Sequence, residues 1–285
     1  MLKYLSTFLL IIMTAVTCFA GNIKVTVYSD EAYPPYSYKE DGRPVGIYTE
    51  IMQKIFSEMH GYDITIKPMP WKRGLKYIES GKGFAIYPPY KYPDKRPYFG
   101  IYSEPILNEQ VVLICRNQIH TKKRIRWPED FEDVTIGINR GFVMGGKKFL
   151  AAKAKNRIKI DEADSNKMNI IKLLRGRIDC YLNGNLSVIW TMNKMMESGE
   201  LPEDTSSRIH YSDYSTTEHG YLGITGRDNG AYPFKADFIK QFNKILKRLK
   251  ADGTIKEIET EFIIRKGIRP ILHIPHHSKN FNIQN

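Results

Sequence analysis

The sequence predicts an α/β protein of two lobes, in which each lobe is a mainly parallel sheet flanked by helices. The chain has 285 residues, of which 42% are hydrophobic and 26% charged, a composition that excludes disorder and can fill two cores. Strand-like and helix-like segments alternate along it, and this alternation occurs twice. Extended segments separate the two series of alternating elements, so we expect each series to form one lobe and the extended segments to join the lobes.

The first twenty residues form a segment of their own. Lys3 is followed by an apolar run over residues 9–16, and Ala20 precedes Gly21. This arrangement is typical of a cleaved secretory signal, whereas a membrane anchor needs a longer apolar run. We expect residues 1–20 to be removed. Cys18 leaves lipid modification open, although Thr17 is bulky for that processing.

The first run of elements begins with NIKVTVYS (22–29), which alternates apolar and polar residues as a strand does. After the turn AYPPY, an amphipathic helix carries Ile51, Ile55 and Met59 on one face and ends at Gly61. The further elements are a strand over 62–70, a short helix over 71–83 and a strand over 84–89.

The second run repeats this order. Its elements are strand 134–141, helix 145–155, strand 157–163, helix 167–178 and strand 179–185. A return strand over 220–225 and a long amphipathic helix from Phe234 to Leu249 follow. We expect lobe 1 to comprise residues 21–107 plus 220–285 and lobe 2 residues 108–219. The crossings near 106–111 and 216–222 would then form a hinge.

Cys115 and Cys180 remain after removal of the signal, each in an apolar run that predicts a buried strand. A disulfide between them and two reduced core cysteines both stay open, because buried cysteine is common. Metal-binding Cys/His spacing is absent from the sequence, so we expect neither a metal nor a cofactor. The formal net charge of +12 favours anionic partners, but no nucleic-acid motif is present.

Ligands of such sheets bind beyond the carboxyl ends of the strands, in the cleft between the lobes. The loops at these ends are AYPPY (32–36), PMPWKRG (68–74), IYPPYKYPDKR (86–96), INRGF (138–142) and LNGN (182–185). All five carry aromatic, Arg or Asn side chains, which suit a polar small molecule.

These loops and their order resemble the family 3 extracellular solute-binding proteins of ABC importers. The resemblance rests on YSDEAYPPYSY, MPWKRGLKYIESGK, YPDKRPYFGIYSEPI, TIGINRGF, LLRGRIDCYLNGN and FNKILKRLKADGTIKEI, and the PWKRG block resembles a divergent subgroup. It implies a type II periplasmic-binding-protein fold with a two-strand hinge. It also implies a periplasmic monomer that closes on an amino acid or related solute and delivers it to an inner-membrane permease.

The resemblance also implies roles for single residues. Arg96 matches the arginine that clamps the solute's carboxylate, Tyr33 and Trp71 match the residues that sandwich the solute, and the Gly141 turn matches one that opens a helix. Arg140 touches the solute or lies outside. The complete expected set is Tyr33, Tyr36, Trp71, Arg73, Tyr87, Pro88, Arg96, Arg140, Gly141, Phe142, Val143, Asn183 and Asn185.

The sequence departs from the family pattern at two places. Pro88 and Pro89 replace residues with hydroxyl groups, and Gly184, between Asn183 and Asn185, replaces the Asp that pairs an α-ammonium group. We therefore expect a small polar solute with a carboxylate, without limiting it to α-amino acids.

Two other functions stay open. A dehydratase-like enzyme on this fold would need an acid in the cleft, and Glu31 and Glu104 are the nearest candidates. No catalytic motif is found, so we assign no catalytic residue and do not expect an enzyme. A ligand-sensing module would use the same site as a transporter's binding protein.

Overall fold

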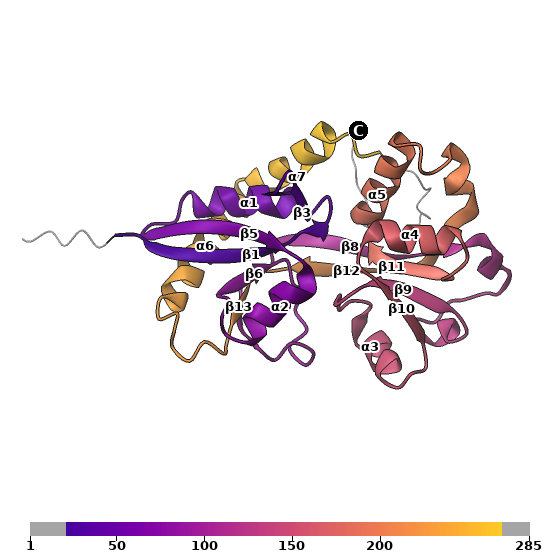
Figure 1. Ribbon diagram of the computed structural model, residues 1–285, viewed down its shortest axis with the longest axis horizontal. Helices are drawn as coiled ribbons and strands as arrows, with labels where there is room; N and C mark the ends of the chain where they lie inside the picture. The colour runs from indigo at the N-terminus through magenta and orange to yellow at the C-terminus, as the bar shows by residue number, and fades with distance from the viewer. Residues whose placement is uncertain (1–20, 270–285) are drawn as a thin grey trace, which may run out of the picture.

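The computed structural model describes residues 21–269. Two five-stranded sheets lie side by side (Figure 1), with strand orders β5-β1-β6-β13-β7 and β10-β9-β11-β8-β12. We call the parts built on them lobe 1 and lobe 2. The predicted signal at 1–20, with Cys18, and the predicted end of lobe 1 at 270–285 lie outside the described residues.

Lobe 1 is formed by two separate parts of the chain. Its strands are β1 (Ile23–Asp30), β5 (Tyr62–Met69), β6 (Ala85–Tyr87), β7 (Phe99–Tyr102) and β13 (Gly223–Thr225). β1 pairs in parallel with β5 and β6, whereas β13 returns antiparallel between β6 and β7. Its helices are α1 (Ile47–Phe56), α2 (Trp71–Glu79), α6 (Lys235–Ala251) and α7 (Thr254–Arg265).

The helices of lobe 1 cover both faces of its sheet. α1, α6 and α7 lie on one face and α2 on the other (Figure 1). Ile47, Ile51 and Ile55 recur every fourth residue of α1 and are fully buried, as expected for the apolar face of an amphipathic helix. Phe238 and Phe242 of α6 pack into the same core.

A small sheet follows β1 where the sequence predicted only a turn. It consists of β2 (Ala32–Tyr33), β3 (Ser37–Glu40) and β4 (Arg43–Val45). These strands are too short to show a periodic pattern. The tight connection between β3 and β4 contains Asp41 and Gly42, both with positive φ, which Gly adopts freely and Asp tolerates.

Lobe 2 has the strands β8 (Leu107–Arg116), β9 (Thr135–Asn139), β10 (Lys159–Ala163), β11 (Cys180–Gly184) and β12 (Ile209–Gly220). Its α-helices are α3 (Gly146–Ala154), α4 (Asn166–Leu174) and α5 (Asn185–Glu197), and short 3-10 turns connect several elements. β9 pairs in parallel with β10 and β11, and β8 pairs antiparallel with β11 and β12. The predicted two-lobed α/β fold is confirmed, and each sheet contains one strand, β13 or β8, that runs antiparallel to both of its neighbours.

The long strands β8 and β12 cross between the lobes (Figure 1). Their antiparallel register runs from Arg116 opposite Ile209 to Leu107 opposite Gly220. Both strands connect directly to lobe 1, because Ile106 N–H donates to Gly220 O at 2.8 Å and Ser103 N–H to Leu222 O at 2.9 Å. We call β8 and β12 the crossing strands. No helix in residues 21–269 is both long and apolar enough for a membrane span.

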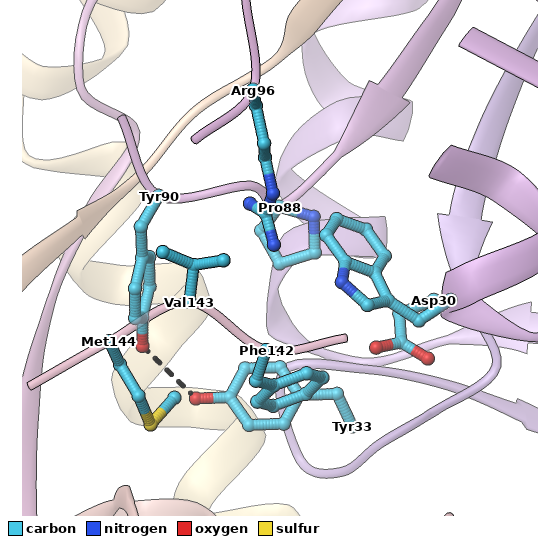
Figure 2. A pocket seen from close by; sticks show the side chains of 9 residues that line it. Asp30, Tyr33, Pro88, Tyr90, Arg96, Phe142, Val143 and Met144 are labelled. Carbon is cyan, nitrogen blue, oxygen red and sulfur yellow. Dashed lines mark hydrogen bonds between the residues drawn. The ribbon is translucent and has the colours of Figure 1, made fainter. Parts of the chain in front are cut away.

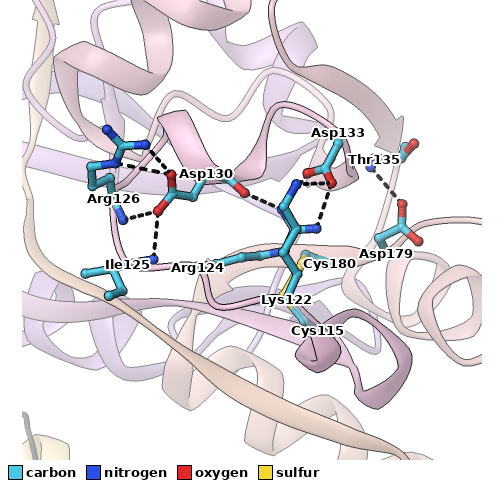
Figure 3. Close-up of polar contacts among 10 residues, drawn as sticks. All are labelled: Cys115, Lys122, Arg124, Ile125, Arg126, Asp130, Asp133, Thr135, Asp179 and Cys180. Atoms are coloured by element: carbon cyan, nitrogen blue, oxygen red, sulfur yellow. Dashed lines mark hydrogen bonds and ion pairs between the residues drawn. A yellow bond between two sulfur atoms is a disulfide. The ribbon is translucent and has the colours of Figure 1, made fainter.

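A disulfide joins Cys115 of β8 to Cys180 of β11 (Figure 3). The adjacent Asp179 accepts hydrogen bonds from Arg116 Nη2 at 2.6 Å and from the Thr135 backbone N–H at 2.9 Å. These contacts attach a crossing strand to the parallel part of the lobe 2 sheet.

Replacing both cysteines tests the value of this bond. The disulfide closes a chain segment of 65 residues, so Cys115→Ala/Cys180→Ala should lower the free energy of unfolding by about 4 kcal/mol. Chemical denaturation with and without reductant measures the effect. The reductant should destabilise the wild-type protein and leave the stability of the double variant unchanged. Equal stability of the wild type and the double variant without reductant would contradict the prediction.

Candidate functional site

A pocket lies where strands of both sheets end (Figure 2). Asp30 is the last residue of β1, Pro88 follows β6 and Phe142 lies three residues beyond β9. This is the place at which open α/β sheets bind ligands. The lining residues are Asp30, Tyr33, Trp71, Pro88, Tyr90, Arg96, Phe142, Val143 and Met144.

Arg96 points into the pocket (Figure 2) and is only 3% exposed. Its Nη2 donates to the Gly141 backbone oxygen at 3.0 Å, and its guanidinium lies 5.4 Å from the centre of the Trp71 ring. No carboxylate among residues 21–269 forms an ion pair with it. Burial lowers the pKa of Arg96, yet an arginine stays charged. The pocket thus contains a buried cation that can grip a carboxylate with two hydrogen bonds.

Trp71 supplies a second donor to the pocket. It is the first residue of α2 and is 8% exposed. Its indole Nε1 is buried and has no hydrogen-bond partner in the structure. An unpaired buried donor is costly, so an acceptor on a bound solute would remove this cost.

Asp30 adds a buried carboxyl group that the sequence analysis missed. It is 2% exposed, and its Oδ1 accepts the Ala32 backbone N–H at 2.9 Å. Burial raises the pKa of Asp30 to about 7; the Ala32 hydrogen bond opposes this rise, and the nearby charge of Glu31 adds to it. Asp30 is the last residue of β1, so the position of the strand end points to it as well as to the loop at 32–36.

Side chains from the two lobes meet across the pocket. The Phe142 ring of lobe 2 packs edge-to-face on Tyr33 and Trp71 of lobe 1, at centroid distances of 5.1 and 6.4 Å. Ser187 of α5 donates a hydrogen bond to the Pro34 oxygen. A water-sized molecule has about 20 Å³ available in the pocket, which is about the room that one water needs. The pocket is therefore too small for a solute larger than water unless its lining residues move apart.

Two predicted tyrosines, Tyr36 and Tyr87, are buried but do not line the pocket. Tyr36 packs on Tyr33 with ring centres 5.1 Å apart. Tyr87 exchanges a hydrogen bond of 2.9 Å with Thr49 of α1. Both are buried, and they support the lining residues.

Two predicted arginines lie on the surface. Arg73 is exposed, 6.0 Å from the centre of the Tyr77 ring. Arg140 is exposed and forms a 2.5 Å ion pair with Asp164. Neither lines the pocket.

The two predicted asparagines face the interior of lobe 2. Asn183 Nδ2 donates to Asn166 Oδ1 at 2.9 Å, and Asn185 Oδ1 accepts the Tyr211 hydroxyl at 2.5 Å. The chain therefore uses their amides for internal hydrogen bonds and does not bring them to the pocket lining.

The glycine turn after β9 does not open a helix directly. Phe142 N–H donates to Asn139 O within a turn, and α3 begins only at Gly146. Gly145 has φ 89° and so stands outside the helix. The turn reaches the pocket by the Phe142 and Val143 side chains and by the Gly141 oxygen, which accepts from Arg96. Tyr90 and Met144 complete the lining without having been predicted, although both lie in or next to predicted loops.

Comparison with known proteins places the chain in a family. Residues 25–264 match the model of bacterial extracellular solute-binding proteins, family 3. The chain belongs to this family. No curated protein matches its sequence. Its fold matches that of two-lobed solute-binding proteins.

Three solved structures illustrate the range of this fold. One is the ancestral amino acid-binding protein AncCDT-1, a precursor of cyclohexadienyl dehydratase, with TM-score 0.61 and 18% identity over 84% of this chain and 95% of that chain. A histidine kinase sensor domain similar to periplasmic binding proteins has TM-score 0.65 and 16% identity over 85% and 96%. A third structure comes from work on glutathione import via GshT and the cystine ABC importer TcyBC of Streptococcus mutans. It has TM-score 0.63 and 18% identity, over 85% of this chain and 95% of that chain.

The buried carboxyl of Asp30 makes a prediction about pH. Because the native pKa of about 7 lies above the ordinary value of 3.8, its stability contribution is full below about pH 4 and is lost as the pH rises through 7. Asp30→Asn removes this loss, at roughly 1.4 kcal/mol for each unit of pKa shift. The melting temperature of the variant relative to wild type should therefore be higher at pH 8 than at pH 4.5. The same difference at both pH values would contradict the prediction.

Proposed function

We propose that this protein captures a small polar solute with a carboxylate, an amino acid or a related molecule, by closing its two lobes around it. In this proposal it is secreted by a cleaved signal, acts in the periplasm as a monomer and delivers the solute to an ABC permease. The membership in the family of extracellular solute-binding proteins supports the coarse function. The geometry of the pocket supports the chemistry of the solute.

The observation that carries the proposal is the buried, unpaired guanidinium of Arg96. A charge removed from water is costly unless an opposite charge or several hydrogen bonds compensate, and within the protein Arg96 has one carbonyl contact and an aromatic face. A solute carboxylate would accept from its free N–H groups, and the unpartnered Trp71 Nε1 offers a further donor. Anion capture would thus satisfy two donors at once.

The position of Asp30 supports the inference that the same solute also carries a cationic group. It is the carboxylate on the pocket lining, and lobe 2 has no acid at the place of Gly184, where the family pattern has one. An ammonium group near Asp30 would keep this carboxyl ionised, since an opposite charge lowers a carboxyl pKa. A zwitterion is therefore the solute that uses both charges of lobe 1.

Thermal melting with a solute panel tests the proposal. The panel contains the amino acids, dipeptides and small organic acids, added to protein that has been unfolded, freed of bound solute and refolded. A true solute at a hundredfold excess over its Kd stabilises the native state by about 2.7 kcal/mol. Arg96→Ala should abolish this shift, and Arg96→Lys should weaken it because lysine lacks the planar fork.

Arg73→Ala is the matched control, because it removes an exposed arginine outside the pocket. It should keep the full shift. Stabilisation of wild type by no member of the panel would overturn the solute-capture proposal. An unchanged shift in Arg96→Ala would remove Arg96 from the site.

Replacing Trp71 with Phe separates binding from stability. Because the indole N–H has no hydrogen-bond partner within residues 21–269, its loss breaks no hydrogen bond of the solute-free protein, and only the packing of the smaller ring should lower the melting temperature. Binding should weaken about tenfold if the solute accepts this hydrogen bond. Isothermal titration gives the affinity, with Trp190→Phe of α5 as control. Full affinity in Trp71→Phe would contradict the assigned role.

A dehydratase-like enzyme is the second candidate. Asp30 favours it, since a carboxyl with a pKa of about 7 in a pocket can act as a general acid near neutral pH. Glu31 instead pairs with Lys39, and Glu104 is exposed. Turnover of a cyclic carboxylate that Asp30→Asn abolishes without loss of binding would establish this reading. A sensing role would use the same capture step.

A further inference from the structure

Glu109 is a fully buried carboxylate on the crossing strand β8. Its Oε2 accepts the hydroxyls of Tyr33 at 2.6 Å and Tyr90 at 2.8 Å, and its Oε1 accepts that of Tyr48 at 2.6 Å. These distances are typical of hydrogen bonds to an ionised oxygen. One carboxylate therefore joins the strand-end loop of β1, the loop after β6 and helix α1. We call these four residues the tyrosine cluster.

Two members of the cluster are walls of the pocket. Tyr33 and Tyr90 line it, and their hydroxyls lie 3.2 Å apart (Figure 2). The Tyr33 ring is also the surface on which Phe142 of lobe 2 packs. The orientation of these rings is thus determined on one side by Glu109 and on the other by the opposite lobe.

The backbone encloses the hydroxyl groups of the cluster. A Cβ atom on Gly184, at the end of β11, would lie 2.5 Å from the Tyr33 hydroxyl. One on Gly220, at the end of β12, would lie 1.8 Å from the Tyr48 hydroxyl. Glycine at these two positions lets the ends of lobe 2 strands approach the cluster closely. The cluster therefore lies at the junction of both lobes and both crossing strands.

The second crossing strand carries a similar contact. Glu218 of β12 lies opposite Glu109 in the β8–β12 register, and it accepts the Tyr92 hydroxyl. Tyr221 N–H also donates to Pro89 O at 3.1 Å. The loop that carries Pro88 and Arg96 is thus attached to both crossing strands.

We propose that Glu109 is a positioning residue, which holds the Tyr33 and Tyr90 rings in the orientation that captures the solute and ties this orientation to the crossing strands. The part of the proposal that concerns solute affinity rests on the proposed function. The part that concerns the rings does not.

Protonation of Glu109 should weaken this hold. An ionised carboxylate only accepts hydrogen bonds and so matches three hydroxyl donors, whereas a protonated one must itself donate. Burial raises the pKa of Glu109 to about 7, the tyrosine hydrogen bonds oppose the rise, and the charge of Glu218 adds to it. The titratable groups around it are Tyr33, Tyr36, Tyr48, Tyr90 and Glu218.

Fluorine NMR of protein labelled with 3-fluorotyrosine tests the ring positions without any solute. Single Tyr→Phe variants assign the resonances of Tyr33, Tyr48 and Tyr90. In the wild type the chemical shifts of these three resonances should change together as the pH is varied, with one midpoint near pH 7. In Glu109→Gln the common titration should vanish and the Tyr33 and Tyr90 signals should shift, because an amide cannot accept all three hydroxyls.

Two variants that keep Glu109 should displace the midpoint in opposite directions. Glu218→Gln removes a neighbouring negative charge and should lower it. Tyr48→Phe removes a hydrogen bond to the ionised form, away from the pocket, and should raise it. These variants keep the test open if Glu109→Gln does not fold.

The solute panel then tests affinity. Glu109→Gln should weaken the binding of the solute that stabilises wild type by about tenfold, while the control Arg73→Ala, at an exposed residue outside the pocket, should bind it as wild type does. Unchanged Tyr33 and Tyr90 signals in Glu109→Gln, or three tyrosines that titrate independently in wild type, would overturn the positioning role. If no panel member stabilises wild type, the proposed function fails and the NMR titration still decides the role of Glu109.

Discussion

The antiparallel pairing of the crossing strands is the constraint on which the rest of the structure depends. The pair belongs to the lobe 2 sheet, and it is joined to lobe 1 because β7 precedes β8, β13 follows β12, and hydrogen bonds link the two connections. Hydrogen bonds between two strands persist when the pair bends or twists as a unit. If the lobes close as proposed, each would keep its own sheet and core.

The two lobes contribute different chemistry to the pocket. Lobe 1 provides the charged groups Asp30 and Arg96, together with the indole of Trp71. Lobe 2 provides the apolar side chains of Phe142 and Val143 with a backbone oxygen. In the proposed function, closure would thus add a layer of low polarity over the charges and strengthen their electrostatic interactions. Lobe 1 would select the solute, and lobe 2 would exclude water from it.

The sequence predicted elements well where a periodic pattern was long enough to read. Strand β1 and helix α6 have such patterns, whereas β2 to β4 are too short for one, and α5 was missed because it follows β11 without a turn. For the site, strand ends located the loops of Trp71, Arg96 and Phe142. Which side chains of a loop face the pocket depends on tertiary packing, so Arg73 and Asn183 were expected there, while Asp30 and the contacts of Glu109 were not.

The small size of the cavity has a consequence for rates. Because the pocket has only about 20 Å³ available, a solute larger than water would be held between Phe142 and the Arg96–Gly141 hydrogen bond if the lobes close over it as proposed. Its release can then be no faster than the separation of the lobes. The residence time of the solute would then be governed by the separation of the two lobes. Solutes of quite different affinity would share the same upper limit on their dissociation rate.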